Sequence, residues 1–224
     1  MNQEFTGRTR VKICCISSLD EARLAIRLGA DALGLVGAMP SGPGVVSDAL
    51  AASIVAQVPP PVATFMLTAE TTLTGILAHQ QRVGANTIQL VDAVPADTYA
   101  RLHEVLPAVK LVQVIHVRDQ QSVDEALVAV ANGVDALLLD SGNPSLTVKE
   151  LGGTGRVHDW SLSRQIVRHS AIPVWLAGGL NPVNAREAIA TVQPFGLDLC
   201  SGVRTNGHLD PIKLTAFMAA LAQP

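Results

Sequence analysis

The chain has 224 residues, of which 48% are hydrophobic and 3% are aromatic, so it can bury a large core of mainly aliphatic side chains. A net charge of −3, with no basic block and few rings to stack on bases, argues against nucleic-acid binding. No apolar run is long enough to span a bilayer and the polar N-terminus lacks the apolar segment of a secretion signal, so neither membrane insertion nor secretion is expected.

Strand-like apolar runs alternate with amphipathic segments of helical length along the chain. Strands are expected to start near Val11, Ala32, Val62, Thr87, Lys110, Asp135, Pro173 and Gly196. Helices are expected near Leu19–Leu28, Asp48–Val58, Thr72–Val83, Ala96–Val105, Ser122–Ala131, Ser161–His169, Pro182–Thr191 and Asp210–Leu221. Alternation of this kind favours a parallel sheet. Eight such units predict one (βα)8 barrel domain over residues 1–224, with 1–10 as a polar extension; an open doubly wound sheet is the main alternative.

A weak internal repeat supports the barrel. The run 29–33 recurs at 133–137, with looser copies at 84–88 and 195–199. The glycine of the repeat suits the left-handed position that ends a helix. We therefore expect four units to return to the sheet through the same kind of turn, at the base of the fold.

The three cysteines, two of them adjacent, match neither a disulfide framework nor the spacing of a zinc site. We expect no metal and no cofactor, and we expect a reducing cytoplasm as the location of the protein.

Chemically active side chains gather where strands end, which is the face that carries the active site in α/β barrels. Cys14 ends the first expected strand and Asp140 ends the sixth. A thiol and a carboxylate at these ends can serve as base and acid. Lys12 lies two residues before Cys14, so its side chain points to the same side of the strand as the thiol. From there it can help to stabilise a thiolate. The long irregular segment 141–159 follows on the same face and suits a lid.

Small residues end the last two strands. Gly178 and Gly179 follow the seventh, and the run Cys200-Ser201-Gly202 follows the eighth. Glycines let backbone N–H groups approach an anion, and the loops after strands seven and eight are the common phosphate site of barrels. The two loops therefore predict a phosphate site.

In combination, these motifs resemble the phosphoribosylanthranilate isomerase family. The matching runs, in the family's order, are Lys12-Ile13-Cys14, Asp31-Ala32-Leu33-Gly34, Leu138-Leu139-Asp140, Gly152-Gly153-Thr154-Gly155-Arg156 with Asp159-Trp160, Ala177-Gly178-Gly179-Leu180-Asn181-Pro182 and Ser201-Gly202-Val203. The family is a (βα)8 barrel that converts an aminoaldose phosphate to an aminoketose, an Amadori rearrangement, in tryptophan biosynthesis. The resemblance implies that Asp140 is the general acid, which opens the ribose ring to a Schiff base, and that Cys14 is the general base, which removes the C2 proton.

The expected partner is a small phosphorylated sugar-amine substrate, and the protein is expected to be a monomer or a homodimer. The residues expected to bind substrate or phosphate are Lys12, Gly153, Gly178, Gly179, Asp198, Cys200, Ser201, Gly202 and Arg204. Asp198 either faces the ligand or pairs with Lys12. Arg204 either binds phosphate or an acidic group of the substrate, or is an exposed surface residue. A hydrogen-bonded structural role is expected for both His116 and His158.

The chain departs from the family pattern mainly at the anthranilate end. The family usually has Gly after the catalytic Cys, where this chain has Cys15. The family's Ser-Pro-Arg type motif, whose Arg holds the anthranilate carboxylate, is replaced by the run 39–47, which contains no Arg. Gln-Leu-His-Gly becomes Gln-Leu-Val-Asp at 89–92, and Ser-Ser-Gly-Val-Glu becomes Cys-Ser-Gly-Val-Arg at 200–204. These changes put the substrate in question more than the reaction type.

Three functions remain open: a phosphoribosylanthranilate isomerase, a relative acting on another phosphorylated aminosugar, and a non-catalytic barrel that binds a phosphorylated metabolite. The presence of both acid and base favours an enzyme.

The thiols supply a further hypothesis. If strands one and eight pair, Cys14 and Cys200 become neighbours above a Lys12–Asp198 pair, while Cys15 faces the helices. Oxidation would then join Cys14 to Cys200.

Overall fold

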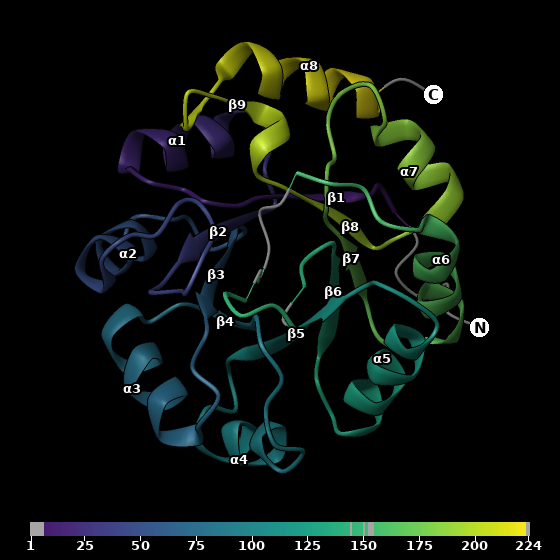
Figure 1. Cartoon of the computed structure of the whole chain (residues 1–224). Helices are drawn as coiled ribbons and strands as arrows, with labels where there is room; N and C mark the ends of the chain where they lie inside the picture. The colour runs from purple at the N-terminus through teal and green to yellow at the C-terminus, as the bar shows by residue number, and fades with distance from the viewer. Residues whose placement is uncertain (1–6, 144, 150, 152–154, 223–224) are drawn as a thin grey trace.

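Eight parallel strands close into a barrel in the computed structural model, which describes residues 7–143, 145–149, 151 and 155–222. Figure 1 views this barrel end-on. The strands are β1 (Arg10–Ile13), β2 (Ala32–Val36), β3 (Ala63–Thr68), β4 (Thr87–Leu90), β5 (Lys110–His116), β6 (Ala136–Asp140), β7 (Val174–Leu176) and β8 (Gly196–Leu199). Each strand pairs with the next, and β8 pairs with β1. The predicted closed barrel is therefore confirmed, and the open sheet is excluded.

A helix follows every strand, and the helices form a ring around the barrel (Figure 1). They are α1 (Leu19–Arg27), α2 (Asp48–Val55), α3 (Leu73–Val83), α4 (Thr98–Val105), α5 (Gln121–Ala131), α6 (Trp160–His169), α7 (Ala185–Val192) and α8 (Pro211–Ala222). No helix in the described part of the chain has both the length and the hydropathy to cross a membrane.

Side-chain caps fix where several helices begin. Ser18, Ser47, Thr72 and Asp159 each accept a hydrogen bond from a backbone N–H in the first turn of the helix that follows. Such caps satisfy N–H groups that have no partner within the helix. They explain why the expected starts of these four helices lie within one residue of the observed ones.

The internal repeat marks turns between helices and strands. Gly29, Gly84 and Gly133 all adopt positive φ, at 98°, 72° and 91°. The fourth turn differs from the prediction: Gln193 takes the left-handed position, with φ of 53°, and Gly196 is instead the first residue of β8.

The third residue of the repeat also has a structural role. In three copies its side chain accepts a backbone N–H from the start of a neighbouring strand. These pairs are Asp31 with Val11, Asn86 with Thr64 and Asp135 with Leu111. The repeat therefore encodes both the turn and its anchor to the sheet.

Aromatic rings fill part of the barrel interior. Trp175 makes edge-to-face contacts with Phe65 and Phe195, at centroid distances of 5.8 and 5.3 Å. A Cβ at Gly196 would lie 2.4 Å from the Trp175 ring, so only glycine fits there. The space between the strands and the helices is filled mainly by aliphatic residues, as the composition predicts.

Two small elements follow β8. A 3-10 turn, η1 (Ser201–Val203), leads into a hairpin of β9 (Arg204–Thr205) and β10 (His208–Leu209). These elements lie next to the site described below.

Candidate active site

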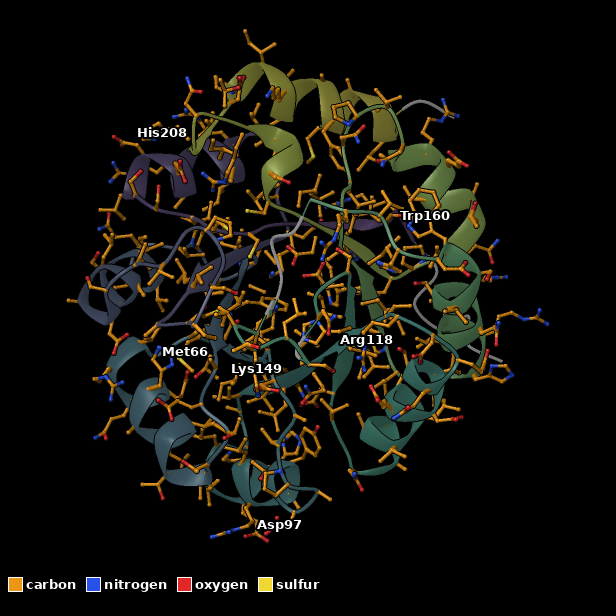
Figure 2. All side chains as sticks on the ribbon, viewed as in Figure 1. Met66, Asp97, Arg118, Lys149, Trp160 and His208 are labelled. Atoms are coloured by element: carbon orange, nitrogen blue, oxygen red, sulfur yellow. The ribbon has the colours of Figure 1, made fainter. Side chains whose placement is uncertain are left out.

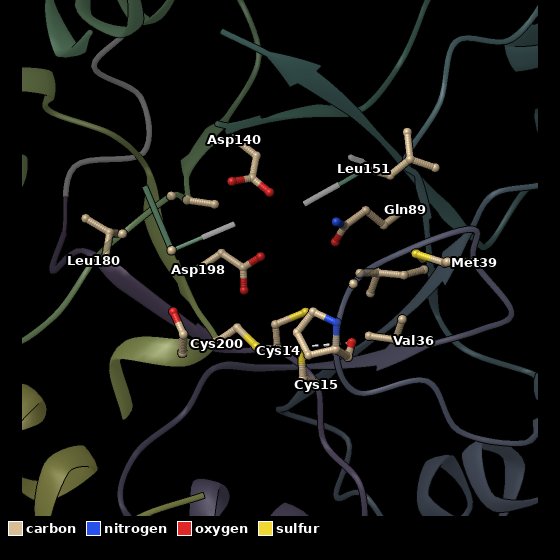
Figure 3. Close-up of a pocket in the computed structure, with 18 of the residues that line it drawn as sticks. Cys14, Cys15, Val36, Met39, Gln89, Asp140, Leu151, Leu180, Asp198 and Cys200 are labelled. Carbon is tan, nitrogen blue, oxygen red and sulfur yellow. Dashed lines mark hydrogen bonds between the residues drawn. The ribbon is translucent and has the colours of Figure 1, made fainter. Parts of the chain in front are cut away.

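A cavity opens at the C-terminal ends of the strands (Figure 3). Its lining comes from seven of the eight strands or the loops that follow them. These residues are Cys14 and Cys15 after β1; Val36, Met39, Ser41, Gly42 and Pro43 in and after β2; Leu67 on β3; Gln89 on β4; Asp140, Leu151 and Gly155 at and after β6; Ala177, Gly178, Gly179 and Leu180 after β7; and Asp198, Cys200 and Ser201 in and after β8. The described residues contain no cluster of three or more His, Cys, Asp or Glu suited to a metal ion.

Cys14 and Asp140 face the same cavity, as the sequence predicts. Figure 3 shows the thiol and the carboxylate on opposite sides of it. The N–H of Cys14 donates to the carbonyl of Leu199 at 2.7 Å, which extends the β1–β8 ladder and fixes the thiol. A Cβ at Gly34 would lie 2.8 Å from Cys14 Sγ, so the glycine makes room for the sulfur. Asp140 accepts a hydrogen bond from the Ser141 N–H at 2.7 Å.

A buried ion pair lies beneath the thiol. Lys12 pairs with Asp198 in the β1–β8 register, and Lys12 Nζ donates to Asp198 Oδ2 at 2.8 Å. Burial acts to lower the pKa of Lys12, but the Asp198 carboxylate outweighs it and raises that pKa to about 12. The lysine therefore stays charged, and the predicted pair is confirmed.

Asp198 also lines the cavity, so pairing with Lys12 does not remove it from the site. Its Oδ1 is buried and has no hydrogen-bond partner among the described residues. Leaving a carboxylate oxygen unpaired in a buried site is costly, so this atom is suited to accept a hydrogen bond from a ligand.

The expected phosphate-binding loops come together at one end of the cavity. Gly178 and Gly179 have φ of 85° and 64°, and both line the cavity with Ser201. Gly202 packs against the same loop, where an added Cβ would lie 1.9 Å from the Leu180 carbonyl oxygen. Gly153, also expected here, lies outside the described residues.

Arg204 does not have the place predicted for it. It is buried rather than exposed, and it is absent from the cavity lining. Its guanidinium donates to the Glu21 carboxylate, with Nη1 2.9 Å from Oε1, and to the carbonyls of Cys14 and Cys15 at 3.1 and 2.6 Å. Because these acceptors occupy both terminal nitrogens, Arg204 fixes the loop behind Cys14 instead of meeting phosphate.

Glu21 completes this arrangement. Besides Arg204, it accepts backbone N–H groups from Ser17 at 3.0 Å and Leu209 at 2.8 Å. We call Glu21 and Arg204 the loop clamp, since together they join α1, the β1 loop and the β9–β10 hairpin. This role was not predicted from the sequence, because neither residue belongs to a local motif that specifies its partner.

Cys15 also departs from the prediction. Its φ is 63°, and its side chain lines the cavity instead of facing the helices. The strand ends at Ile13, so the alternation of side chains between its two sides does not predict the direction of the side chain at residue 15. The sulfur beside Cys200 Sγ, at 2.6 Å, is therefore that of Cys15 and not that of Cys14. One signal for this geometry was present in the sequence: the family usually has glycine there, the residue best suited to positive φ.

The other end of the cavity carries no positive side chain among the described lining residues. Gln89 has a buried Oε1 without a partner among the described residues. Lys149, which is labelled on the β4–β5 side of the barrel in Figure 2, forms an ion pair with Asp92 after β4.

The two histidines singled out in the sequence have structural partners, as predicted. His116 Nε2 lies 3.0 Å from the Val91 carbonyl oxygen, and His158 Nε2 lies 2.7 Å from Ser163 Oγ.

Comparison with known proteins gives a consistent result. Residues 11–220 match the family model for N-(5'-phosphoribosyl)anthranilate isomerase. The N-(5'-phosphoribosyl)anthranilate isomerase 2 of Methanosarcina mazei is 35% identical over 93% of this chain and 92% of its own length.

Solved structures agree. The phosphoribosylanthranilate isomerase of Thermotoga maritima superposes with a TM-score of 0.81 at 29% identity, covering 95% of this chain and 98% of that one. A phosphoribosylanthranilate isomerase in complex with reduced 1-(o-carboxyphenylamino)-1-deoxyribulose 5-phosphate gives 0.78 at 28% identity, with the same coverage.

Proposed function

The chain belongs to the N-(5'-phosphoribosyl)anthranilate isomerase family, and on that premise we propose that Cys14 and Asp140 carry out the Amadori rearrangement of a phosphoribosyl-amine. As a member of this family, the chain is an isomerase of tryptophan biosynthesis. The observation that carries the assignment of residues is the placement of a thiol and a carboxylate on opposite sides of one cavity (Figure 3). A reaction that needs one proton delivered and another removed requires such a pair.

Asp140 acts first, as the general acid. Its carboxyl proton passes to the ribose ring oxygen, the bond from that oxygen to C1 breaks, and the nitrogen lone pair forms the C1=N bond of a Schiff base. The buried position of Asp140, on the last residue of β6, limits competition from water for this proton transfer.

Cys14 then acts as the general base. Its thiolate takes the proton from C2, and the electron pair of the C–H bond forms the enolamine, which becomes the aminoketose by proton transfer to C1. The Lys12 ammonium supports the thiolate: a Cβ at Gly34 would lie 2.8 Å from Cys14 Sγ and 3.1 Å from Lys12 Nζ, so both groups border the same small space.

The phosphate of the substrate binds at the backbone N–H groups of Gly178, Gly179, Ser201 and Gly202. This assignment is supported by the positive φ of the two glycines and by the lack of a cationic side chain among the described lining residues. Backbone amides provide the positive partial charge that an anion needs. A cytoplasmic location is part of the same proposal.

A second candidate is the same rearrangement on another phosphorylated aminosugar. One observation favours it: the described residues of the run 39–47, where the family carries its carboxylate-binding Arg, bring no positive side chain to the cavity.

The test is whether the purified protein converts N-(5'-phosphoribosyl)anthranilate. The decrease in the fluorescence of the substrate's anthranilate group monitors this turnover. Complementation of an isomerase-deficient strain on medium without tryptophan provides a second readout. We expect turnover and growth. Turnover of a different phosphorylated aminosugar alone would favour the second candidate, and phosphate binding without any turnover would favour a non-catalytic barrel.

A further inference from the structure

Three sulfurs meet at one edge of the cavity (Figure 3). Cys15 Sγ lies 2.6 Å from Cys200 Sγ, and Cys14 is the adjacent residue in the chain. All three cysteines are free thiols in this structure. The chain therefore carries two thiols, beyond the one assigned to catalysis, in direct contact with each other.

The backbone holds this contact in place. Cys15 adopts a φ of 63°, a conformation that few residues other than glycine take readily. Gly44 packs against it so closely that an added Cβ would lie 2.4 Å from Cys15 Cβ. Arg204 binds the carbonyl oxygens of Cys14 and Cys15. On the other side, Cys200 directly follows β8, which pairs with β1 up to Leu199.

We infer that Cys15 and Cys200 form a dithiol that a peroxide converts to a disulfide, and that this bond reversibly inactivates the site. A disulfide bond is about 2.05 Å long, so the two sulfurs need to approach by only about half an ångström. The inference about activity rests on the proposed function, whereas the inference about the bond does not.

The chemistry proceeds in two steps. The Cys200 thiolate attacks one oxygen of hydrogen peroxide, the O–O bond breaks, and the departing hydroxide is protonated to water, leaving a sulfenic acid. The Cys15 sulfur then attacks the Cys200 sulfur, the S–O bond breaks, and hydroxide leaves with the Cys15 proton as a second water. Both sulfurs are oxidised by one electron each and the peroxide is reduced by two.

The surroundings assign these roles to the two thiols. Cys200 is partly exposed to the cavity, whereas Cys15 is buried. The hydrogen bond with Cys15, together with the Arg204 charge, lowers the pKa of Cys200, so Cys200 is the thiol that attacks. The hydrogen bond with Cys14 and the bond with Cys200 raise the pKa of Cys15, so it keeps its proton until the second step.

The bond affects catalysis because Cys15 directly follows Cys14 in the loop after β1. A disulfide to Cys200 ties this loop to the loop after β8 and pulls the backbone next to Cys14 toward it. Because a misplacement of about 1 Å can cost about 10²-fold in rate, we expect the bond to lower turnover by about tenfold or more.

The experiment compares wild type with Cys15→Gly and Cys14→Ser, each in its reduced and peroxide-treated forms. Intact mass distinguishes a disulfide, which loses two hydrogen atoms, from a sulfenic or sulfinic acid, which gains oxygen. Cys15→Gly should fold because positive φ suits glycine, and Cys14→Ser retains both thiols of the proposed pair.

Wild type and Cys14→Ser should both lose two hydrogens and recover them with dithiothreitol, whereas Cys15→Gly should not. Wild-type turnover should fall at least about tenfold and recover on reduction, because the loop that carries Cys14 is displaced, and Cys15→Gly should keep more of its own reduced turnover. Formation of a disulfide in Cys15→Gly, or its loss in Cys14→Ser, would overturn the pairing. Full turnover of the disulfide form would overturn the inactivation. If reduced wild type has no turnover, the proposed function fails and the mass data alone decide the bond.

Discussion

At the scale of single residues, the site depends on a charge buried directly beneath its thiol. Lys12 has an exposed fraction of 0%, and one oxygen of its partner Asp198 is buried without a hydrogen-bond partner among the described residues. A lysine is fully buried only when the interaction with a partner offsets the free-energy cost of removing its charge from water. The position therefore carries a structural requirement that can be measured as stability.

The first prediction concerns the stability that this pair provides. Lys12→Met preserves much of the side-chain volume but leaves Asp198 without its partner, so the free energy of unfolding should fall by about 3–5 kcal/mol. Lys110→Met is the matched control, since Lys110 pairs with Asp135 at the surface and is 65% exposed. Loss of that pair should cost about 0–1 kcal/mol. Urea denaturation of the two variants measures both values, and equal losses would contradict a special role for the buried pair.

The second prediction concerns the proposed acid and base. Cys14→Ser and Asp140→Asn should each lower kcat by roughly 10²–10⁴-fold, because each removes one proton-transfer group. Circular dichroism and unfolding curves should change little for either variant. Asp97→Asn, on the outer rim before α4 (Figure 2), should retain wild-type kcat. A Cys14→Ser variant with full kcat would remove the thiol from the mechanism.

At the scale of secondary-structure elements, the loop clamp joins parts of the chain that are distant in sequence. Arg204 precedes the turn of the β9–β10 hairpin, and Glu21 lies 183 positions earlier, in the first turn of α1. Their contact also fixes the carbonyl oxygens of Cys14 and Cys15. The conformation of the loop after β1 is therefore set from outside the barrel.

The third prediction concerns the dependence of stability on pH. Burial acts to raise the pKa of Glu21, but the hydrogen bonds from Arg204 and from backbone N–H groups outweigh it and lower that pKa below 4.5. A carboxyl with a lower pKa in the folded state contributes stability above its unfolded pKa, and this contribution is lost as the pH falls through the folded value. Glu21→Gln should therefore be less stable than wild type at neutral pH, and the difference should shrink as the pH falls below about 4.5.

Asp20→Asn is the control for this experiment, because Asp20 is the neighbouring residue and its side chain is 94% exposed. Its stability should stay within about 0.5 kcal/mol of wild type at every pH. Thermal unfolding between neutral and acidic pH provides the comparison. A Glu21→Gln deficit that does not change with pH would contradict the contribution of its ionised form.

The element scale also shows what the sequence could reveal. The eight strands and eight helices were predictable because apolar periodicity, caps and turn glycines are local signals. The β9–β10 hairpin has strands of only two residues each, which carry no periodic signal. The contacts of Arg204 and the direction of the Cys15 side chain depend on tertiary structure, and no local sequence pattern specifies tertiary contacts. The Lys12–Asp198 pair was predictable because barrel closure brings β1 and β8 together.

At the scale of the whole molecule, the cavity has two chemically different ends. The loops after β7 and β8 present glycines and backbone amides, whereas β2 to β4 present Val36, Leu67 and the amide of Gln89. The charged side chains among the described lining residues are the carboxylates of Asp140 and Asp198. Such a cavity suits a substrate with a phosphate at one end and an uncharged group at the other.

The fourth prediction follows from this distribution of charge. Ser41 lines the cavity in the run 39–47, where the family's Ser-Pro-Arg type motif carries its Arg. Ser41→Arg would give an anthranilate carboxylate a charged partner, and a charge-assisted hydrogen bond contributes about 1.5–3 kcal/mol. The KM of the variant for N-(5'-phosphoribosyl)anthranilate should therefore be about tenfold lower than that of wild type, or lower still. Steady-state kinetics measures the difference.

Ser41→Met separates charge from size, since it adds bulk at the same position without a positive charge. If Ser41→Met lowers KM as much as Ser41→Arg, then packing against Met39 and Leu67 controls affinity and the carboxylate does not. If neither variant changes a wild-type KM that already lies within the ordinary range of about 1 μM to 1 mM, the carboxylate has another partner. Gln89 would then be the first residue to examine, because its side-chain nitrogen can donate to a carboxylate and its Oε1 is unpartnered among the described residues. The opposite result is a substrate preference of the wild-type enzyme for phosphoribosyl derivatives of uncharged aromatic or aliphatic amines over that of anthranilate. The cavity explains such a preference, because the charged side chains among its described lining residues are the carboxylates of Asp140 and Asp198.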